Sequence, residues 1–214
     1  AGRGHRLGGD IPKQYLTLGD ASVLRVTLAA FLSVQAITSI QVVIHPDDRR
    51  LYDAALDGLR DTRLAPPAMG GASRAMSVLA GLEALAAAPP SRVLIHDAAR
   101  PFASQRVIAD VLAALRTAPG AFAALPVVDA LWRAEDGIAA DPVPRAGLWR
   151  AQTPQGFHFD AILAAHRTGD PDAADDVAIA RAAGLAVRVV PGAEENFKIT
   201  TQDDLARARA LMGR

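Results

Sequence analysis

Short apolar runs and longer segments of helical period alternate along this 214-residue chain, and the alternation constrains the fold more than any other feature of the sequence. The apolar runs at residues 39–45, 92–96, 121–126 and 186–190 are predicted to be buried strands. Apolar residues at helical spacing predict helices at 23–32, 48–59, 74–87, 104–116, 160–167, 175–183 and 202–212. Strands that alternate with helices in this way indicate βαβ units. We therefore expect an α/β fold with a mostly parallel, twisted sheet flanked by helices.

Two residues support the predicted helix ends. Ser104 is a good N-cap for the helix at 104–116, and Gly184 can end the helix at 175–183. The length suits one domain of ordinary size, and 50% hydrophobic with 21% charged residues is the composition of a soluble globular protein. A single domain over residues 1–214 is therefore expected.

Residues 127–154 interrupt the alternation because they contain no good helix. The similar pieces ALWRA and GLWRA flank a turn-rich middle, and together they predict a two-stranded arm over about residues 128–154. Trp132 and Trp149 would be exposed on such an arm, which favours a partner surface there. The alternative is that both side chains pack on their own domain, and the sequence leaves the two interpretations open.

Charge and residue usage exclude several classes of protein. The 23 basic and 23 acidic residues cancel, which argues against binding of nucleic acid or of a membrane surface. No apolar run approaches 18 residues and no signal-peptide pattern is visible, so we expect a cytoplasmic protein without a membrane span. The absence of cysteine excludes disulfides and thiolate chemistry. Four histidines, at positions 5, 45, 158 and 166, lack the spacing of a zinc site.

The first sixteen residues, AGRGHRLGGDIPKQYL, combine glycines with cations. Glycines expose backbone N–H groups and the cations supply charge, which together suit a polyphosphate. The spacing is neither that of a P-loop nor that of a dinucleotide-binding fingerprint. A flexible loop with solvated cations is the alternative, and both interpretations stay open. The residues concerned are Gly2, Gly4, Gly8, Gly9, Arg3, Arg6 and Lys13.

Two later segments place polar groups near predicted element ends. In GGASRAMSVLAGL, Gly70 and Gly71 precede a helix, which favours a backbone that approaches a ligand. HDAARP follows a strand directly, at the sheet edge where open α/β folds bind ligands. Asp97 there can accept hydrogen bonds or hold a metal, and Arg100 can pair with an anion; a capping Asp with an Arg partner is the alternative.

Further polar residues have two interpretations each. Lys198 in ENFKIT is either a solvated surface group or a group that points into a site. Arg145 and Arg150, taken alone, are interpreted as solvated charges on the arm. His96 is interpreted as structural rather than catalytic.

Seven segments in order resemble one family over nearly the whole chain: AGRGHR, PKQYL, GGASRAMSV, HDAARP, PVVDA, GLWRAQTPQGF and ENFKIT. They are similar to the 2-C-methyl-D-erythritol 4-phosphate cytidylyltransferases of non-mevalonate isoprenoid biosynthesis. The resemblance implies a Rossmann-like nucleotidyltransferase fold with a protruding two-stranded arm that forms a homodimer. It implies transfer of CMP from CTP to methylerythritol phosphate with Mg²⁺ and release of pyrophosphate. The chemistry fits, because an acceptor phosphate is already an anion and needs cations and alignment rather than a base.

The resemblance also implies roles for individual residues. Arg6 and Lys13 correspond to groups that stabilise the triphosphate in the transition state, and Lys198 and Arg145 to the pair that positions the acceptor, with Arg145 reaching into the neighbouring subunit's site. Arg74 is interpreted as holding its own loop. The implied nucleotide-binding residues are Ala1, Gly2, Arg3, Gly4, Gly70, Gly71, Ala72, Ser77, Asp97 and Ala98. The implied substrate-binding residues are Asp97, Arg100, Ala130, Arg145, Thr153 and Lys198, and Asp97 is the implied metal ligand.

The chain departs from the family pattern at two positions, since Ala130 and Ala174 stand where hydroxyl residues are usual. The resemblance also implies a first apolar strand ahead of residue 1. Some members carry a fused or associated cyclodiphosphate synthase domain, and the sequence leaves open whether one follows residue 214. Two alternatives to the main function remain. One is a ribitol-5-phosphate cytidylyltransferase, and the other is a non-catalytic nucleotide-binding module that kept the fold.

Overall fold

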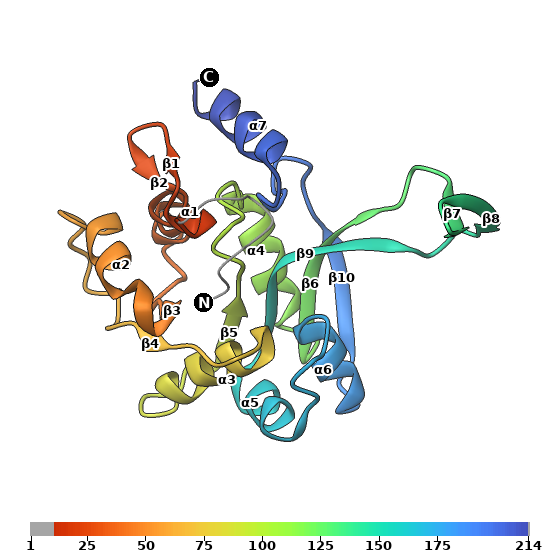
Figure 1. Ribbon diagram of the computed structural model, residues 1–214. Coiled ribbons are helices and arrows are strands. Elements are labelled where there is room, and N and C mark those ends of the chain that lie inside the picture. Colours follow the sequence, from red (N-terminus) through yellow and green to blue (C-terminus); the bar gives the residue numbers. More distant parts are fainter. Residues whose placement is uncertain (1–10, 214) are drawn as a thin grey trace.

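The computed structural model describes residues 11–213. Its main sheet has four strands in the order β10–β6–β9–β5 (Figure 1). The strands are β10 (Val187–Pro191), β6 (Gly120–Pro126), β9 (Trp149–His158) and β5 (Arg92–Ile95). Ala1, Gly2, Arg3, Gly4 and Arg6, which the sequence assigns to the nucleotide, lie outside the described residues.

The strands of this sheet do not all run in one direction. β10 pairs with β6 in parallel, whereas β9 is antiparallel to both β6 and β5. The α/β class is therefore confirmed, and the sheet is mixed. The physical reason lies in the chain path: after β6 the chain runs outward and returns directly as β9, and a direct return beside the preceding strand gives antiparallel pairing.

Helices cover both faces of the main sheet. On one face α4 (Gln105–Ala114) packs the fully buried Val107 and Val111 against Ala121 and Ala123 of β6. On the other face Phe157 of β9 lies in a cluster with three helices, α3 (Arg74–Leu85), α5 (Phe159–Thr168) and α6 (Asp176–Ala182). The sheet is thus buried on both sides, as an α/β fold requires.

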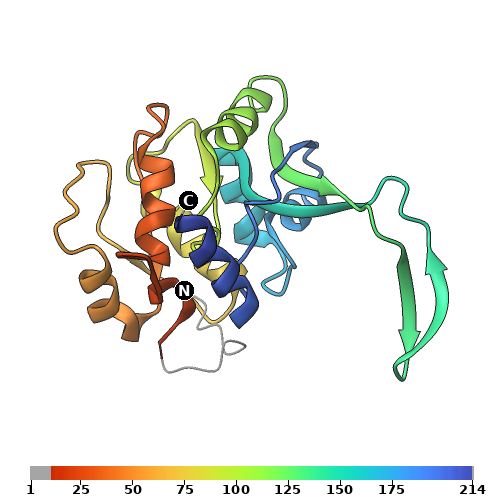
Figure 2. The same ribbon diagram turned by 90° about the horizontal axis from the view of Figure 1, so that it is seen from above.

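A second packing unit lies beside β5 and is formed mainly by residues 11–70 (Figure 2). Its core joins Leu24 and Leu28 of α1 to Ile44 and to Tyr52 of α2. The elements are η2 (Lys13–Tyr15), β1 (Thr17–Leu18), β2 (Ala21–Ser22), α1 (Val23–Leu32), β3 (Val43–Ile44), η3 (Pro46–Asp48), α2 (Arg49–Ala55) and β4 (Ala68–Met69). β3 covers only two residues, so the strand expected at 39–45 is shorter than predicted. It pairs with β4 in parallel.

The helix predictions hold with small shifts at the ends. α1 and α7 (Gln202–Met212) have the predicted bounds. Ser104 caps α4 by accepting a hydrogen bond from the Val107 N–H, and Gly184 follows α6 with a φ of +80°. None of the helices in the described part of the chain is long and apolar enough to cross a membrane.

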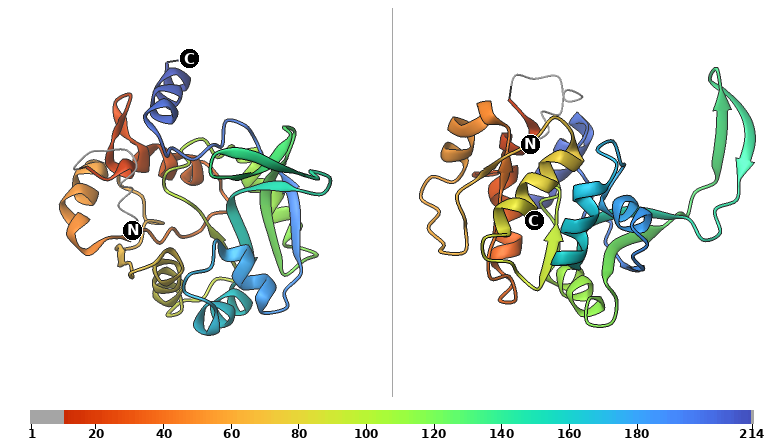
Figure 3. Two further views of the ribbon diagram at one scale, coloured as in Figure 1. Left: turned by 45° about the vertical axis from the view of Figure 1, so that its right-hand side comes forward. Right: turned by 90° about the horizontal axis from the view of Figure 1, so that it is seen from below.

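A hairpin protrudes from the body of the protein between β6 and β9 (Figures 1 and 3). It consists of β7 (Leu131–Glu135) and β8 (Ile138–Val143), joined by Asp136 and Gly137 with positive φ angles. Such an Asp-Gly pair matches the twist of the two strands. The predicted pairing of ALWRA with GLWRA is wrong, because GLWRA leads into β9 and pairs with β6.

The two tryptophans of this region are exposed in the chain. Trp132 on β7 is 58% exposed, and Trp149 at the start of β9 is 45% exposed. Their own domain therefore does not bury them. A role of the hairpin in dimerisation stays a prediction.

Gly156 in β9 provides a test of the packing between α4 and the sheet. A Cβ atom at this position would lie 2.8 Å from side-chain atoms of Leu94 and Val111 and 2.9 Å from Leu115. We expect Gly156→Ala to lower the free energy of unfolding by about 1–3 kcal/mol through overpacking, measured by urea denaturation. Gly213→Ala is the control, since a Cβ there meets nothing within 4 Å. Equal stability of both variants and the parent would contradict this packing.

Candidate functional site

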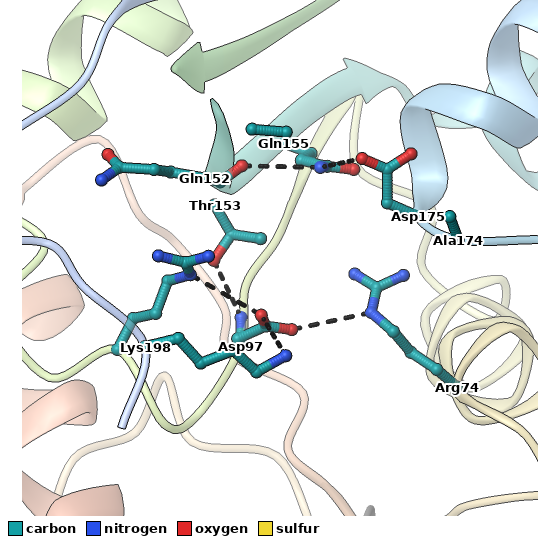
Figure 4. Close-up of a pocket in the computed structure, with 10 residues that line it drawn as sticks. Arg74, Asp97, Gln152, Thr153, Gln155, Ala174, Asp175 and Lys198 are labelled. Carbon is teal, nitrogen blue, oxygen red and sulfur yellow. Dashed lines mark hydrogen bonds and ion pairs between the residues drawn. The ribbon is translucent and has the colours of Figure 1, made fainter. Parts of the chain in front are cut away.

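A pocket of about 190 Å³ opens where β5 ends, beside the middle of β9. It lies at the carboxyl end of β5, an edge strand of the main sheet, and open α/β sheets bind ligands at the carboxyl ends of their strands. Residues from five separate parts of the chain meet there (Figure 4). The charged and polar residues that line it are Arg74, Asp97, Arg100, Gln152, Thr153, Gln155, Asp175 and Lys198.

Asp97 is the centre of the charge arrangement in this pocket (Figure 4). Its Oδ2 lies 2.9 Å from the Lys198 Nζ and 3.6 Å from the Arg100 Nε, and its Oδ1 lies 3.6 Å from the Arg74 Nε. Burial on its own raises the pKa of this carboxyl, but the nearby charges of Lys198 and Arg74 outweigh burial and hold that pKa well below its usual value. The carboxylate is therefore ionised at neutral pH.

Two hydrogen bonds fix the backbone of Asp97, one of them to a side chain of β9. The Asp97 N–H donates to the Thr153 hydroxyl oxygen over 3.1 Å, and the Arg100 N–H donates to the Asp97 carbonyl over 2.9 Å. Arg100 also donates from Nη1 to the carbonyl of Asn196 at 2.8 Å. The structure thus brings together Asp97, Arg100, Thr153 and Lys198, four residues that the sequence assigned to substrate binding.

Arg74 has a larger part in the pocket than the sequence indicated. It is the first residue of α3, and its Nη2 lies 2.6 Å from Oδ2 of Asp176, whose side chain is fully buried. The other oxygen of Asp176 lies 3.1 Å from His166 Nε2 on α5. The interpretation of Arg74 as a brace for its own loop is therefore wrong: it connects α3 to α6 and to Asp97.

Gln155 is a functional neighbour that the sequence reasoning missed. This side chain of β9 is 2% exposed and donates from Nε2 to Asp175 Oδ2 over 3.0 Å. Its Oε1 accepts from the N–H groups of Asp176 and Val177 at the start of α6. A buried amide between a strand and a helix start was not predictable without knowing that residue 155 lies in a strand.

The loop assigned to the nucleobase lies between β4 and α3, outside the lining of this pocket. A Cβ on Gly71 would lie 2.6 Å from the Met76 Cβ, so this position has no room for a side chain next to Met76. The approach of its backbone to a ligand stays a prediction. The Gly70 N–H donates to the Ile44 carbonyl, and the Ser77 hydroxyl donates to the carbonyl of Ser73 over 2.9 Å.

Four further site candidates also lie away from the pocket lining. Lys13 begins η2, and the Ala98 carbonyl accepts from the hydroxyl of Thr27 over 2.8 Å. Ala130 precedes β7, and Arg145 lies between β8 and β9, where its guanidinium donates to the Val128 carbonyl. The pocket of this chain therefore receives neither Ala130 nor Arg145.

The residues present fit a divalent cation only in a limited way. Asp97 is a carboxylate that Mg²⁺ can use, but both of its oxygens face cations. Among residues 11–213 no group of three or more His, Cys, Asp or Glu side chains could hold a metal ion. Mg²⁺ commonly binds through one or two carboxylates together with substrate phosphates. The donor set of the described residues therefore fits a cation that arrives with a polyphosphate and contacts Asp97. It does not fit a metal held by protein side chains alone.

Comparison with known proteins agrees with the fold and the site. The family model for 2-C-methyl-D-erythritol 4-phosphate cytidylyltransferase (IspD) matches residues 1–214. A bifunctional IspD/IspF enzyme of Paramagnetospirillum magneticum is 53% identical over 99% of this chain and 54% of the relative. A 2-C-methyl-D-erythritol 4-phosphate cytidylyltransferase of Cereibacter sphaeroides is also 53% identical, over 99% of this chain and 93% of the relative. The chain thus spans about half the length of the bifunctional relative.

Solved structures lead to the same conclusion. A crystal structure of a 4-diphosphocytidyl-2C-methyl-D-erythritol synthase aligns with a TM-score of 0.85 at 30% identity, covering 94% of each chain. The cytidylyltransferase of Thermus thermophilus aligns with a TM-score of 0.79 at 35% identity, covering 98% of this chain and 96% of that one. The fold is that of a nucleotidyltransferase. The chain belongs to the 2-C-methyl-D-erythritol 4-phosphate cytidylyltransferase family, whose nucleotide substrate is CTP.

The charge arrangement around Asp97 predicts a pH-dependent contribution to stability. Because the folded pKa lies below the unfolded value of about 3.9, the stabilisation is complete above that value and is lost as the pH falls below it. We expect Asp97→Asn to lower the free energy of unfolding at pH 7 by about 1–3 kcal/mol, since three cations lose their shared carboxylate.

Urea denaturation at several pH values measures this effect. The difference between parent and Asp97→Asn should stay constant from pH 7 down to about pH 4 and shrink as the pH falls further toward 3. Asp53→Asn is the matched control, because Asp53 forms an exposed pair with Arg49 on α2 and its loss should change stability little. A difference that stays constant down to pH 3 would mean that Asp97 is not held ionised by its neighbours.

Proposed function

We propose that this protein transfers CMP from CTP to 2-C-methyl-D-erythritol 4-phosphate and releases pyrophosphate, a step of isoprenoid precursor biosynthesis. The observation that carries the proposal is the convergence of Arg74, Arg100 and Lys198 on an ionised Asp97 in one pocket at the end of β5. Three cations in a small polar pocket suit an organic phosphate, and membership of the family supplies its identity.

The proposed reaction is an in-line displacement at the α-phosphorus of CTP. A phosphate oxygen of the acceptor forms a bond to that phosphorus, the bond to the β-phosphate bridging oxygen breaks, and pyrophosphate leaves with the electron pair. No proton has to be removed from the acceptor phosphate. The protein therefore lowers the barrier by alignment and by offsetting negative charge, which cations accomplish and a general base does not.

Lys198 is proposed to hold the acceptor phosphate together with Arg145 from the neighbouring subunit. Asp97 and Arg100 are proposed to face the acceptor's hydroxyls, and Asp97 also orients Lys198. Thr153 contributes by accepting a hydrogen bond from the Asp97 N–H, which fixes the backbone at Asp97. The triphosphate is assigned to Arg6 and Lys13, and the base to the Gly70–Ser77 loop with Ala98. Mg²⁺ is proposed to enter with CTP, to contact Asp97 and to offset charge on the triphosphate.

The hairpin is proposed to complete the neighbouring site in a homodimer. Two observations support this: the exposed Trp132 and Trp149, and the position of Arg145 outside its own chain's pocket. A cyclodiphosphate synthase, fused or separate, is proposed as the enzyme that works alongside this domain, as the bifunctional relatives suggest by their names. We place the reaction in the cytoplasm, where CTP is available.

The proposed acceptor is tested by pyrophosphate release from CTP with Mg²⁺. We expect turnover with 2-C-methyl-D-erythritol 4-phosphate and at least about 100-fold lower kcat/KM with ribitol 5-phosphate, because hydrogen-bonding sites discriminate strongly between hydroxyl patterns. Faster use of ribitol 5-phosphate would replace the proposed acceptor. No release with either acceptor would favour a non-catalytic nucleotide-binding module.

Mixed dimers test the proposed exchange of Arg145 between subunits. Lys13→Ala and Arg145→Ala proteins should each lose most activity, about 100-fold or more, since each removes a charge that contacts a phosphate. Mixing them should restore activity, because one site of each heterodimer then receives an intact Lys13 and an intact Arg145. Differently tagged subunits verify that heterodimers form. No recovery in verified heterodimers would place Arg145 in its own subunit's site.

A further inference from the structure

His96 has no part in the proposed reaction, yet it contacts two of the segments that build the pocket. It follows β5 directly and its ring lies against Phe31 of α1, with ring centroids 4.6 Å apart. Its Nε2 lies 3.0 Å from the Arg100 carbonyl, and its Nδ1 lies 2.9 Å from the Thr153 hydroxyl. One imidazole thus connects the HDAARP turn to β9.

These contacts define the hydrogen positions on the ring. A carbonyl oxygen only accepts, so Nε2 must carry the hydrogen that it donates to Arg100. In a neutral ring Nδ1 then accepts from the hydroxyl of Thr153, and the Thr153 oxygen accepts the N–H of Asp97. The neutral Nε2–H form therefore satisfies every partner. Burial is the main reason that the pKa of His96 falls to about 4. The hydrogen bond to the Arg100 carbonyl and the charge of Asp97 oppose that shift, and the charge of the Arg100 guanidinium favours it.

Asn196 completes the connection from the other side. Its side chain is fully buried, and Nδ2 donates to the Thr153 carbonyl over 2.8 Å and to Gln152 Oε1 over 3.3 Å. Its backbone carbonyl accepts from Arg100 Nη1. The bonds therefore form a closed ring of four residues: His96, Thr153, Asn196 and Arg100.

The ring joins the three segments that carry the charged groups of the pocket. One follows β5 and holds Asp97, one is the middle of β9, and one is the segment after β10 that holds Lys198. A further bond, from the Ile199 N–H to the Ala99 carbonyl at 2.9 Å, ties the last segment to the first. Lys198 is thus fixed on both sides, by Asn196 before it and Ile199 after it.

We propose that His96 and Asn196 are positioning residues that hold Arg100 and Lys198 in register with Asp97, as two members of one hydrogen-bonded ring. The inference rests on the proposed function of the pocket as the acceptor site. Neither residue touches the reacting atoms. Each acts through Thr153 and Arg100, and small displacements of aligned groups reduce rates strongly.

A double-mutant cycle tests whether the two residues act as one unit. His96→Phe keeps the aromatic contact with Phe31 but removes both hydrogen bonds, and Asn196→Leu removes the two donated bonds at similar volume. Each single variant should lower kcat/KM for the acceptor about 10- to 100-fold while KM for CTP changes less than about twofold. The double variant should have about the same kcat/KM as the less active single variant, since a second break in the same ring of hydrogen bonds adds little.

The matched control is His158→Phe. His158 at the other end of β9 also lies 3.0 Å from a carbonyl through Nε2, that of Leu115, but it is not part of the ring. Its activity should stay within about twofold of the parent. Multiplying effects in the double variant, or an equal loss in His158→Phe, would overturn the proposal. If His96→Phe does not fold, His96→Leu replaces it, because its side chain can neither donate to the Arg100 carbonyl nor accept from the Thr153 hydroxyl.

Two readouts separate positioning from a general loss of stability. Thr153→Ser should retain more activity than Thr153→Val, and Thr153→Val should resemble His96→Phe, because only the serine keeps the hydroxyl that His96 accepts from. The pH profile of His96→Phe should keep the parent's shape between pH 5.5 and 8.5, since His96 is neutral there with Asp97 and Arg100 as its charged neighbours. Disappearance of an ionisation from that range would make His96 an acid or base and contradict the proposal.

The nitrogen chemical shifts of the His96 imidazole provide a test that does not depend on activity. At pH 7 they should report the neutral Nε2–H form in the parent and a changed environment in Asn196→Leu. An Nδ1–H or cationic ring would overturn the proposal. Failure of the proposed function gives a different result, namely no pyrophosphate release by the parent with these shifts still as expected.

Discussion

The ionised carboxylate of Asp97 is the group on which the site depends, because three cations from three parts of the chain converge on it. Lys198 lies closest at 2.9 Å, and the guanidinium groups of Arg74 and Arg100 lie at 3.6 Å. Without a central anion these cations would repel one another in a pocket partly removed from water. With it, their charges stay close together and an incoming phosphate meets a prepared environment. The rest of the local structure serves that arrangement: Thr153 holds the backbone of Asp97, and the buried Asp176 holds Arg74.

The path of β9 explains how the chain assembles these groups. Because β9 returns from the hairpin between β5 and β6, its polar residues 152–155 come to lie beside the end of β5. The side chains of Gln152 and Gln155 then reach the segment after β10 and the start of α6 respectively. β9 is the one strand of the main sheet that runs antiparallel to the others. It therefore connects the segment after β10 with the start of α6, and the same strand leads out to the hairpin.

Much of the secondary structure and several site residues could be predicted from local sequence patterns. The pairing of segments far apart in the chain could not. The helices α1 and α7 and the cap at Ser104 follow from apolar period and capping preference. Asp97, Arg100, Thr153 and Lys198 came from motif resemblance, and they do meet. The partner of β7, the direction of β9 and the contact between Arg74 and Asp176, 102 positions apart, depend on which segments become neighbours. A single sequence read for local pattern contains no signal for such pairings.

The central claim is that the pocket around Asp97 binds the phosphate of the acceptor. The most direct measurement is a crystal structure of the protein with 2-C-methyl-D-erythritol 4-phosphate and a non-hydrolysable CTP analogue with Mg²⁺. The account predicts the acceptor phosphate within hydrogen-bonding distance of Lys198, with an acceptor hydroxyl on Asp97. An acceptor bound elsewhere, with the ion pairs of Asp97 unchanged and no ligand atom near them, would contradict it.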